Sequence, residues 1–190
     1  MNKETLRKVY LEKRLSLSRE EKDRRDRILC NIFMEQVKDR NIRYLHLFLP
    51  IAEKNEPDTF LLIERLRKEK PEIEIVVPRI LSGHELEHIR LQNPHTIEFN
   101  HWGIPEPRGG EPFDISKLDM VLLPLVIFDR KGSRIGYGKG FYDRFLSELP
   151  QETLTIGYTL TVPLDKIPYI ESHDVPMDAC ICPLGYLEFG

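Results

Sequence analysis

The chain has 190 residues, of which 41% are hydrophobic and 31% charged, and its formal net charge is −3 with neutral histidines. These values are typical of a globular domain and exclude a disordered, collagenous or coiled-coil protein. No apolar run approaches the roughly 20 residues that a membrane helix needs, and a mildly acidic chain is not a general nucleic-acid binder. We therefore expect a single domain over residues 1–190 and a monomer, with no membrane or nucleic-acid partner.

The N-terminus and the cysteines bear on the cellular compartment of the protein. The charged N-terminus carries no apolar segment of the signal-peptide kind, so we expect a cytoplasmic protein. Three cysteines, Cys30, Cys180 and Cys182, give an odd number without zinc-ligand spacing, which predicts buried thiols. The first forty residues carry a net charge of +4, and this local excess leaves room for a basic site that binds a small anion.

The first half of the chain predicts a βαβ unit behind two helices. Apolar residues recur with helical spacing over residues 3–15 and 19–37, and Ser18 with Glu21 forms a capping box for the second helix. An apolar run over residues 44–49 predicts a buried strand. Asp58 is placed to cap a helix that continues to residue 66, and residues 73–77 form a second strand before Pro78. This order predicts parallel strands with a right-handed crossover.

The second half continues the alternation. Residues 79–113 are less regular, with a candidate hairpin about Ser82 and Gly83 and a proline- and glycine-rich loop over residues 103–110. Residues 120–128 predict a central strand, 141–149 a helix, 154–158 a strand and 179–182 the last strand. We expect an α/β domain of three layers, in which a mostly parallel, Rossmann-like sheet has helices on both faces.

A glycine-rich loop between the central strand and the next helix carries the strongest functional signal. Four glycines within residues 132–140 let backbone N–H groups approach a ligand, and the next helix points its positive end at the same place. Backbone donors and cations together suit a polyphosphate, and Asp143 is a hard oxygen ligand of the kind that holds Mg²⁺. The alternative is a flexible turn with solvated charges. The cations around the loop are Lys131, Arg134, Lys139 and Arg144.

The N-terminal helix offers a second cationic group. Lys3 and Arg7 lie one turn apart, and Arg14 lies two turns further along the same face. An anionic ligand would offset the conflict between these cations and the helix dipole. A solvated basic face, with Glu4 and Glu12 as partners, is the other interpretation.

Other polar and aromatic residues are ambiguous. Asp178, at the entrance of the last strand, is a second candidate ligand for Mg²⁺ or a structural carboxylate. His173 could be a surface or loop residue, and Trp102 either part of the core or a stacking surface. No nucleophile elbow or Cys–His signature is present.

These residues together resemble the 5-formyltetrahydrofolate cyclo-ligase family. The resemblance rests on the segment from Arg134 to Arg144, RIGYGKGFYDR, and on the pair Lys3 and Arg7. It extends to residues 48–49, Glu56 to Thr59, the loop 103–107 and His173, Asp174 and Asp178, so that it spans essentially the whole chain. Two departures are a longer segment over residues 50–55, directly before Glu56, and Phe141 where a tyrosine is common.

The resemblance implies an enzyme that uses ATP and Mg²⁺ to convert 5-formyltetrahydrofolate to 5,10-methenyltetrahydrofolate. It implies metal ligands at Asp143 and Asp178 and catalytic roles for Lys139, Arg134 and Tyr142. It implies folate contacts at Arg7, Leu49, Glu56, Tyr137, Gly138, Lys139, Gly140 and Phe141. It implies ATP contacts at Lys3, Glu4, Thr5, Leu6, Arg7, Arg134, Ile135, Gly136, Tyr137, Gly138, Lys139, Gly140, Phe141 and Tyr142.

Two rival functions remain at this point. A sugar-phosphate isomerase or CoA-transferase relative would share a similar architecture and bind phosphates in loops at strand ends, without a need for ATP. A folate- or nucleotide-binding protein without catalysis is the second rival, and the presence of Lys139, Asp143 and Asp178 argues against it.

Overall fold

A seven-stranded, mostly parallel sheet forms the centre of the molecule. The computed structural model describes residues 2–81, 85–92, 97–101, 103–168 and 174–190. The strand order is β11-β10-β9-β6-β1-β2-β3, and only the two edge pairs, β10–β11 and β2–β3, are antiparallel. The strands of this sheet are β1 (Tyr44–His46), β2 (Glu74–Ile80), β3 (Leu86–Arg90), β6 (Met120–Pro124), β9 (Leu154–Tyr158), β10 (Ala179–Cys182) and β11 (Gly185–Glu188).

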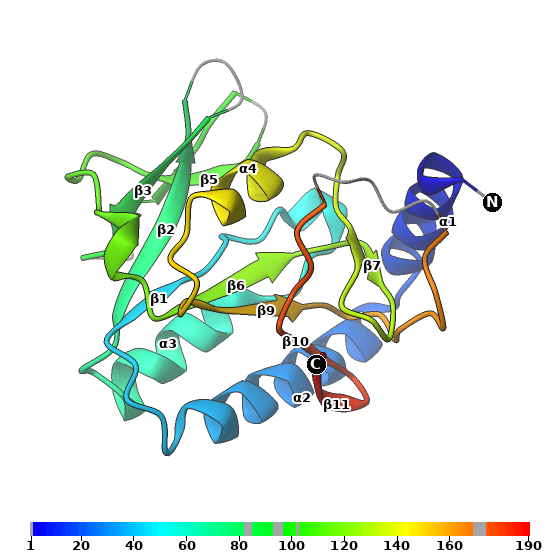
Figure 1. Ribbon diagram of the computed structural model, residues 1–190, viewed down its shortest axis with the longest axis horizontal. Coiled ribbons are helices and arrows are strands. Elements are labelled where there is room, and N and C mark those ends of the chain that lie inside the picture. Colours follow the sequence, from blue (N-terminus) through cyan, green and yellow to red (C-terminus); the bar gives the residue numbers. More distant parts are fainter. Residues whose placement is uncertain (1, 82–84, 93–96, 102, 169–173) are drawn as a thin grey trace.

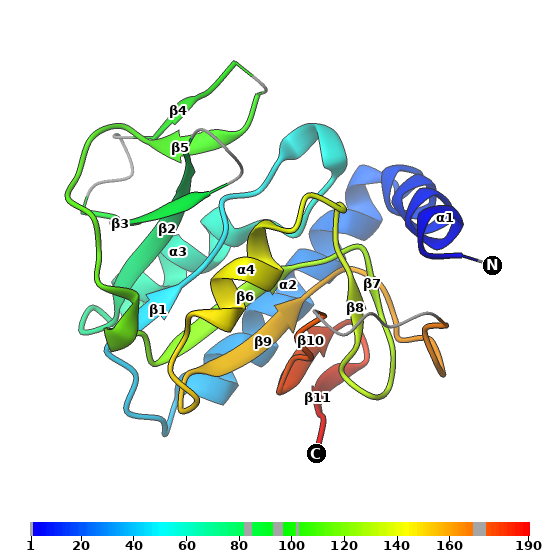
Figure 2. The same ribbon diagram turned by 45° about the horizontal axis from the view of Figure 1, so that its top comes forward.

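Helices cover both faces of the sheet, as the sequence predicts (Figure 1). On one face, α2 (Arg19–Val37) and α3 (Thr59–Glu69) pack on alternate strand residues, and on the other lies the short helix α4 (Phe141–Ser147). The remaining helix, α1 (Lys3–Leu15), lies beside a small hairpin of β7 (Ile127–Phe128) and β8 (Arg134–Ile135), as Figure 2 shows. The three-layer α/β architecture is confirmed.

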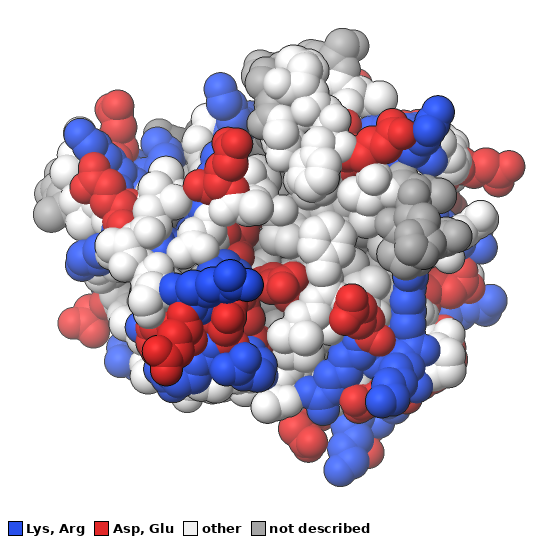
Figure 3. Space-filling model, turned by 180° about the vertical axis from the view of Figure 1, so that it is seen from behind, with Lys and Arg blue, Asp and Glu red and all other residues white. Residues whose placement is uncertain are grey.

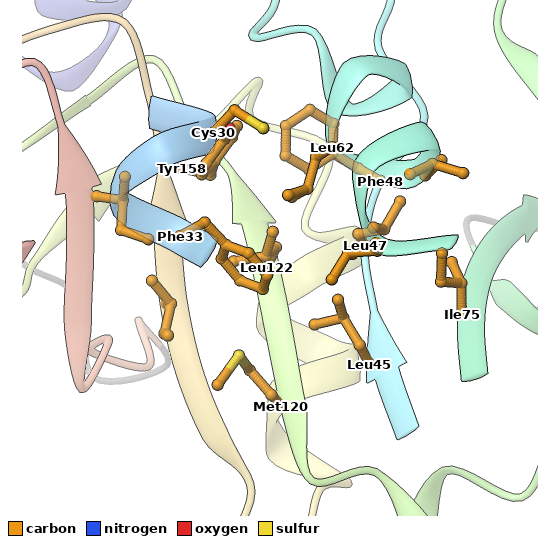
Figure 4. Close-up of a cluster of buried hydrophobic side chains, with 14 of the residues drawn as sticks. Cys30, Phe33, Leu45, Leu47, Phe48, Leu62, Ile75, Met120, Leu122 and Tyr158 are labelled. Carbon is orange, nitrogen blue, oxygen red and sulfur yellow. The ribbon is translucent and has the colours of Figure 1, made fainter. Parts of the chain in front are cut away.

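The larger core lies between the sheet and helices α2 and α3. Figure 4 shows Phe33 of α2 against Leu122 of β6, and Leu62 of α3 in the same cluster of side chains as Leu45 of β1; all four side chains are fully buried. Alternate residues of β6 face opposite layers, because side chains along a strand point in turn to its two faces. The core thereby fixes the sheet on which the loops at its carboxyl edge are built.

Local capping signals account for the helix boundaries. Ser18 Oγ accepts the backbone N–H of Glu21 at 3.2 Å, and Asp58 accepts the N–H groups of Phe60 and Leu61. These bonds satisfy N–H groups that the first helical turn leaves without partners. Both helices therefore begin where the sequence predicts.

The structure corrects several predicted strand boundaries. The first strand ends at His46 rather than residue 49, and β2 continues through Pro78 to Ile80. The apolar run 120–128 is broken at Pro124, which lies at the end of β6, and its last two residues pair with β8 instead. The helix after the glycine-rich loop ends at Ser147 rather than residue 149.

Short antiparallel strands account for the other corrections. The loop 103–110 contains β5 (Pro105–Pro107), which pairs with β4 (Ile97–Phe99) as a two-stranded ribbon. Proline is tolerated there because such a ribbon leaves edge positions without ladder bonds. The chain also continues beyond β10 into β11, so residues 179–182 are not the last strand. The candidate turn at Ser82 and Gly83 lies outside the described residues, although β2 and β3 on either side of it pair antiparallel.

Candidate active site

A cavity of about 1350 Å³ opens at the carboxyl edge of the sheet. Phe48 and Leu49, just beyond β1, and Pro124, at the end of β6, form its floor. Ligands bind at this edge in open α/β sheets because the loops that follow parallel strands gather there. The walls come from α1, the 3₁₀ turn η1 (Ala52–Lys54), strand β5 and the continuous stretch 134–144.

The glycine-rich loop is held against α1. The Arg7 side chain donates from Nε to the carbonyl of Gly136 at 2.8 Å. Gly138 lies directly over the Arg7 guanidinium with φ of +81°, and a Cβ at this position would be 3.0 Å from Arg7 Cζ. Both the backbone conformation and the close approach therefore require glycine at residue 138. The contact joins two segments that the sequence predicts as separate cationic groups.

A second arginine of α1 is buried. Arg14 is 1% exposed and donates to the carbonyls of Lys54, at 2.8 Å, and Leu125, at 3.1 Å, and to the hydroxyl of Tyr137. That hydroxyl in turn donates to Glu56, whose carboxyl lines the cavity although its residue is 3% exposed. Arg14 therefore does not belong to a solvated basic face.

Burial governs the titration of this network. It raises the pKa of Glu56, while hydrogen bonds from Ile51 N and Tyr137 and the charges of Arg14 and Lys54 act in the opposite direction. It also raises the pKa of Tyr137, so that the hydroxyl keeps its proton. The cavity thus has a buried polar group at Glu56, which the Tyr137 hydroxyl connects to the glycine-rich loop.

Two ion pairs lie at the loop end of the cavity. Arg134 Nη2 contacts Asp143 Oδ1 at 2.6 Å, and another nitrogen of the same guanidinium donates to the carbonyl of Val175. Burial lowers the pKa of Arg134 from its ordinary value. Lys3 Nζ pairs with Asp174. Lys139, by contrast, is exposed at the cavity wall and takes part in no ion pair within the described residues.

The structure gathers most of the predicted site residues at one cavity. Two of the predicted ATP-binding residues lie off its wall: Leu6 packs on Ile127 and Ile135, and Thr5 bonds to Asn2 within the helix cap. Those that line the cavity are Lys3, Glu4, Arg7, Leu49, Glu56 and the stretch from Arg134 to Asp143.

Asp178 lies away from the cavity. It precedes β10, at the amino edge of a parallel sheet whose carboxyl edge carries the site, and its Oδ2 accepts from the backbone N and Oγ1 of Thr155 at 2.7 and 2.6 Å. It is absent from the cavity lining, whereas Asp143 is part of it. The structure therefore does not bring the two predicted metal ligands together. His173 and Trp102 lie outside the described residues.

The family of the chain follows from comparison with known sequences. A profile of the 5-formyltetrahydrofolate cyclo-ligase family matches residues 1–183. The chain belongs to this family. The family's Escherichia coli (strain K12) cyclo-ligase is 33% identical over 138 residues, which are 70% of this chain and 75% of the relative. The Mus musculus cyclo-ligase is 27% identical over 184 residues and covers 90% of this chain, with 89% of the relative matched.

Solved structures of cyclo-ligase relatives have the same fold. The 5,10-methenyltetrahydrofolate synthetase of Aquifex aeolicus superposes with a TM-score of 0.80 at 30% identity, and covers 99% of this chain and 93% of its own. A synthetase from Mycoplasma pneumoniae gives a TM-score of 0.76 at 28% identity, covering 95% and 98%. The agreement over nearly whole chains confirms the mostly parallel sheet of this cyclo-ligase.

Several features of the cavity are not predicted from the sequence. Lys54 Nζ lies 4.1 Å from the centroid of the Tyr137 ring, a cation–π contact across the cavity wall. Glu106, on β5, lines the cavity and accepts the N–H of Ile80. Beneath α4, His88 Nδ1 lies 3.1 Å from Nε2 of His46. The surplus length of the segment 50–55 is the one sequence signal that pointed to the Lys54 turn.

The histidine pair supports α4 from below. The Phe145 ring stacks on His88 with centroids 4.1 Å apart, and the edge of Tyr142 faces His46 at 6.5 Å. Burial lowers the pKa of His46 well below its ordinary value and that of His88 to about 4, so both rings are neutral at pH 7. The Tyr142 hydroxyl is buried, and its pKa is raised by burial and then by the charge of Glu56.

Proposed function

We propose that this chain catalyses the ATP-dependent conversion of 5-formyltetrahydrofolate to 5,10-methenyltetrahydrofolate, with release of ADP and phosphate. One observation carries the proposal: a single cavity joins a glycine-rich loop, held by Arg7 and flanked by cations, to a buried carboxylate, Glu56. The first end suits the phosphates of ATP and the second suits N–H donors of a pterin ring. The activity belongs to folate one-carbon metabolism and matches the names of the relatives.

The nucleotide is assigned to the loop end of the cavity. The sequence from Arg134 to Tyr142, together with Lys3 and Arg7 of α1, surrounds it. Lys139 is an exposed cation there that takes part in no ion pair among the described residues, and we assign it the phosphoryl group that is transferred. Arg134 is already paired with Asp143, so its role is to hold that carboxylate and to add positive charge behind the loop. Because α4 has only seven residues, the charge comes from side chains and loop N–H groups rather than from a long helix dipole.

The folate is assigned to the part of the cavity around Leu49, Glu56 and Phe141. Leu49 and Phe141 offer apolar contact for the ring system, and Glu56 offers a carboxylate that accepts N–H groups. One face of Tyr137 is covered by Lys54, and Phe141 is a further aromatic ring of the same cavity lining. Arg7, which lies between the two ends, would attract either a phosphate or the glutamate tail of the folate.

The reaction needs alignment rather than a protein nucleophile. The formyl oxygen attacks the γ-phosphorus and ADP leaves. N10 then attacks the activated carbon, loses its proton, and phosphate departs with the former formyl oxygen. Phosphoryl transfer is accelerated mainly by position and by charge stabilisation. Among the described residues, the cavity lining holds lysine, arginine and backbone donors but no cysteine or histidine, and its one serine is Ser147 on the far turn of α4.

The carboxylates of the site fit a Mg²⁺ ion that is held jointly by the protein and by the phosphates of ATP. Asp143 lines the cavity, and the described residues contain no group of three or more His, Cys, Asp or Glu that could form a complete metal cage. Mg²⁺ beside phosphates takes only one or two carboxylates from a protein. We assign Asp143 as that ligand and leave Asp178 out, because its carboxylate bonds to Thr155. Bound Mg²⁺ would neutralise phosphate charge.

Tyr142 is assigned a positioning role. Its hydroxyl is buried without a hydrogen-bond partner among the described residues, and its ring lies edge-on to His46 with centroids 6.5 Å apart. The ring therefore fixes the start of α4, and through it the orientation of Lys139 and Phe141.

The surroundings of the cavity suit a small-molecule enzyme that works as a monomer. Every wall named above comes from one copy of the chain. On the face drawn in Figure 3, basic and acidic side chains are interspersed around an uncharged strip, with no broad basic field for nucleic acid. No helix in the described ranges has the length and apolar character to cross a bilayer. Size-exclusion chromatography with light scattering tests the monomer.

The deciding experiment follows the methenyl product by its near-ultraviolet absorption. The protein is incubated with 5-formyltetrahydrofolate, ATP and Mg²⁺, and parallel reactions omit one component each. We expect product only in the complete mixture, with one ADP per product. Product formed equally well without ATP would refute the proposal, and binding of both ligands without turnover would favour the non-catalytic rival.

A further inference from the structure

Arg14 is a buried cation that the assigned ligand contacts do not use. It is 1% exposed and does not line the cavity. Its guanidinium nevertheless donates to three segments that line the cavity or lie next to the cavity floor. These are the η1 turn through the Lys54 carbonyl, the connection after β6 through the Leu125 carbonyl, and the glycine-rich loop through the Tyr137 hydroxyl. Burying an arginine is costly unless its donors are satisfied, and here each of the three guanidinium nitrogens has an acceptor.

The hydrogen bonds have a fixed direction. A guanidinium donates and never accepts, so the Tyr137 oxygen accepts from Arg14 and its only proton is directed to Glu56 Oε1. The other carboxyl oxygen, Oε2, accepts the N–H of Ile51 at 2.7 Å. Both oxygens of Glu56 are acceptors, which is the pattern of the ionised carboxyl group.

The groups that face Glu56 come from four elements. Arg14 of α1 and Lys54 of η1 favour its ionised form, and the Tyr137 hydroxyl donates to it. The charge of Glu56 also raises the pKa of Tyr142 of α4. Burial alone favours the neutral acid, so the balance depends on these partners. Among them, the Arg14 guanidinium also fixes the direction of the Tyr137 proton.

We infer that Arg14 is a positioning residue which, through the Tyr137 hydroxyl, keeps the Glu56 carboxylate ionised and available to accept N–H groups of the folate ring. The inference rests on the proposed function, because it takes the ring bound at Glu56 to be the reduced pterin of the substrate. It assigns Arg14 no contact with either ligand. Its effect on folate is therefore indirect and depends on the protonation of Glu56.

The test is the pH dependence of KM in an Arg14→Lys variant. A lysine keeps one positive charge but cannot bridge three acceptors in fixed directions. Loss of the fixed donor raises the pKa of Glu56, so that the carboxyl takes up a proton as pH falls. We expect KM for 5-formyltetrahydrofolate to rise about tenfold near pH 5.5, the effect of roughly one pKa unit, and to return towards the wild-type value by pH 8.5. KM for ATP and kcat should change less than about twofold.

Three matched variants separate this effect from loss of structure. Tyr137→Phe removes the hydroxyl but leaves the carbonyl bonds of Arg14, and should show the same pH-dependent KM. In a Glu56→Gln background, Arg14→Lys should add no further change, because the titrating group is gone. Arg25→Lys is the control: Arg25 of α2 bridges to the Leu160 carbonyl at 2.7 Å away from the cavity, and its substitution should leave kinetics unchanged.

The outcomes are distinguishable. If KM for folate rises equally at every pH, or KM for ATP rises with it, Arg14 serves only as a structural support and the inference is wrong. If Arg14→Lys does not fold, as judged by circular dichroism, Tyr137→Phe decides in the same way. A wild-type protein without turnover would refute the proposed function, whereas normal wild-type turnover with pH-independent variants would refute the role of Arg14 alone.

Discussion

Replacing Gly138 by alanine tests whether the glycine-rich loop owes its shape to its own backbone and to Arg7. Gly138 has φ of +81°, and an added Cβ would lie 3.0 Å from Arg7 Cζ and from its Nη2. Two neighbours provide matched comparisons. Gly140 has φ of +73° with no atom within 4 Å of the place that an added methyl would take, and Gly136 has open space and no left-handed φ. The three positions therefore separate backbone strain from crowding.

The expected magnitudes follow from these geometries. A left-handed conformation costs a residue with a Cβ about 1–2 kcal/mol, so Gly140→Ala should lose that much unfolding free energy. Gly138→Ala should lose about 2–4 kcal/mol, because the Arg7 guanidinium must also move and weaken its bond to the Gly136 carbonyl. Gly136→Ala should be neutral or stabilising by up to about 1 kcal/mol, through the entropy of the unfolded chain.

Urea unfolding of the ligand-free variants measures these differences. The free energies are compared at equal m-values, so that all three variants report on the same unfolding transition. KM for ATP, measured separately, reports whether displacement of Arg7 reaches the nucleotide site. If Gly138→Ala and Gly136→Ala have the same stability, the loop is not held as described, and the contact between α1 and residue 138 does not constrain it.

Three further predictions concern charge and packing. Burial lowers the pKa of His88 from about 6.5 to about 4, so the unfolded chain takes up the proton at a higher pH than the folded chain does. The free energy of unfolding should therefore fall by about 3 kcal/mol as pH drops through this range. Urea unfolding midpoints of a His88→Gln variant should fall less over the same range. Asp143→Asn should raise the Mg²⁺ concentration for half-maximal turnover about tenfold, whereas an equal rise in Asp178→Asn would contradict the placement of that residue outside the cavity. Leu122→Ala, at a fully buried site, should lose about 2–5 kcal/mol in urea unfolding, and a loss below about 1 kcal/mol would refute tight packing there.

Local signals account for what the sequence predicts well. Ser18 and Asp58 mark helix starts because capping bonds reach only two or three residues along the chain. The long apolar run that contains β6 identifies the centre of the sheet because only a strand buried on both faces needs such a composition. The short strands β4, β5 and β11 lack either signal, and prolines at 105 and 107 are typical of loops.

Long-range contacts account for what it predicts poorly. The spacing of Arg7 and Arg14 shows that they share a helix face, but which element covers that face depends on residues more than a hundred positions away. The position of Asp178, by contrast, could have been predicted from the sequence. A residue at the entrance of a parallel strand lies at the amino edge of the sheet, opposite the edge where loops bind ligands.

The contacts of α1 allow the ligand site to form only late in translation. Lys3 pairs with Asp174 across 171 positions, and Arg7 bonds to Gly136 across 129. A nascent chain that has emerged from the ribosome only as far as β6 holds α1 and much of the core, but it has neither partner with which to close the cavity. Folate and ATP stabilise only species that bind them. They therefore cannot protect the growing chain, which must avoid aggregation and proteolysis by its βαβ core alone until the last third has been translated.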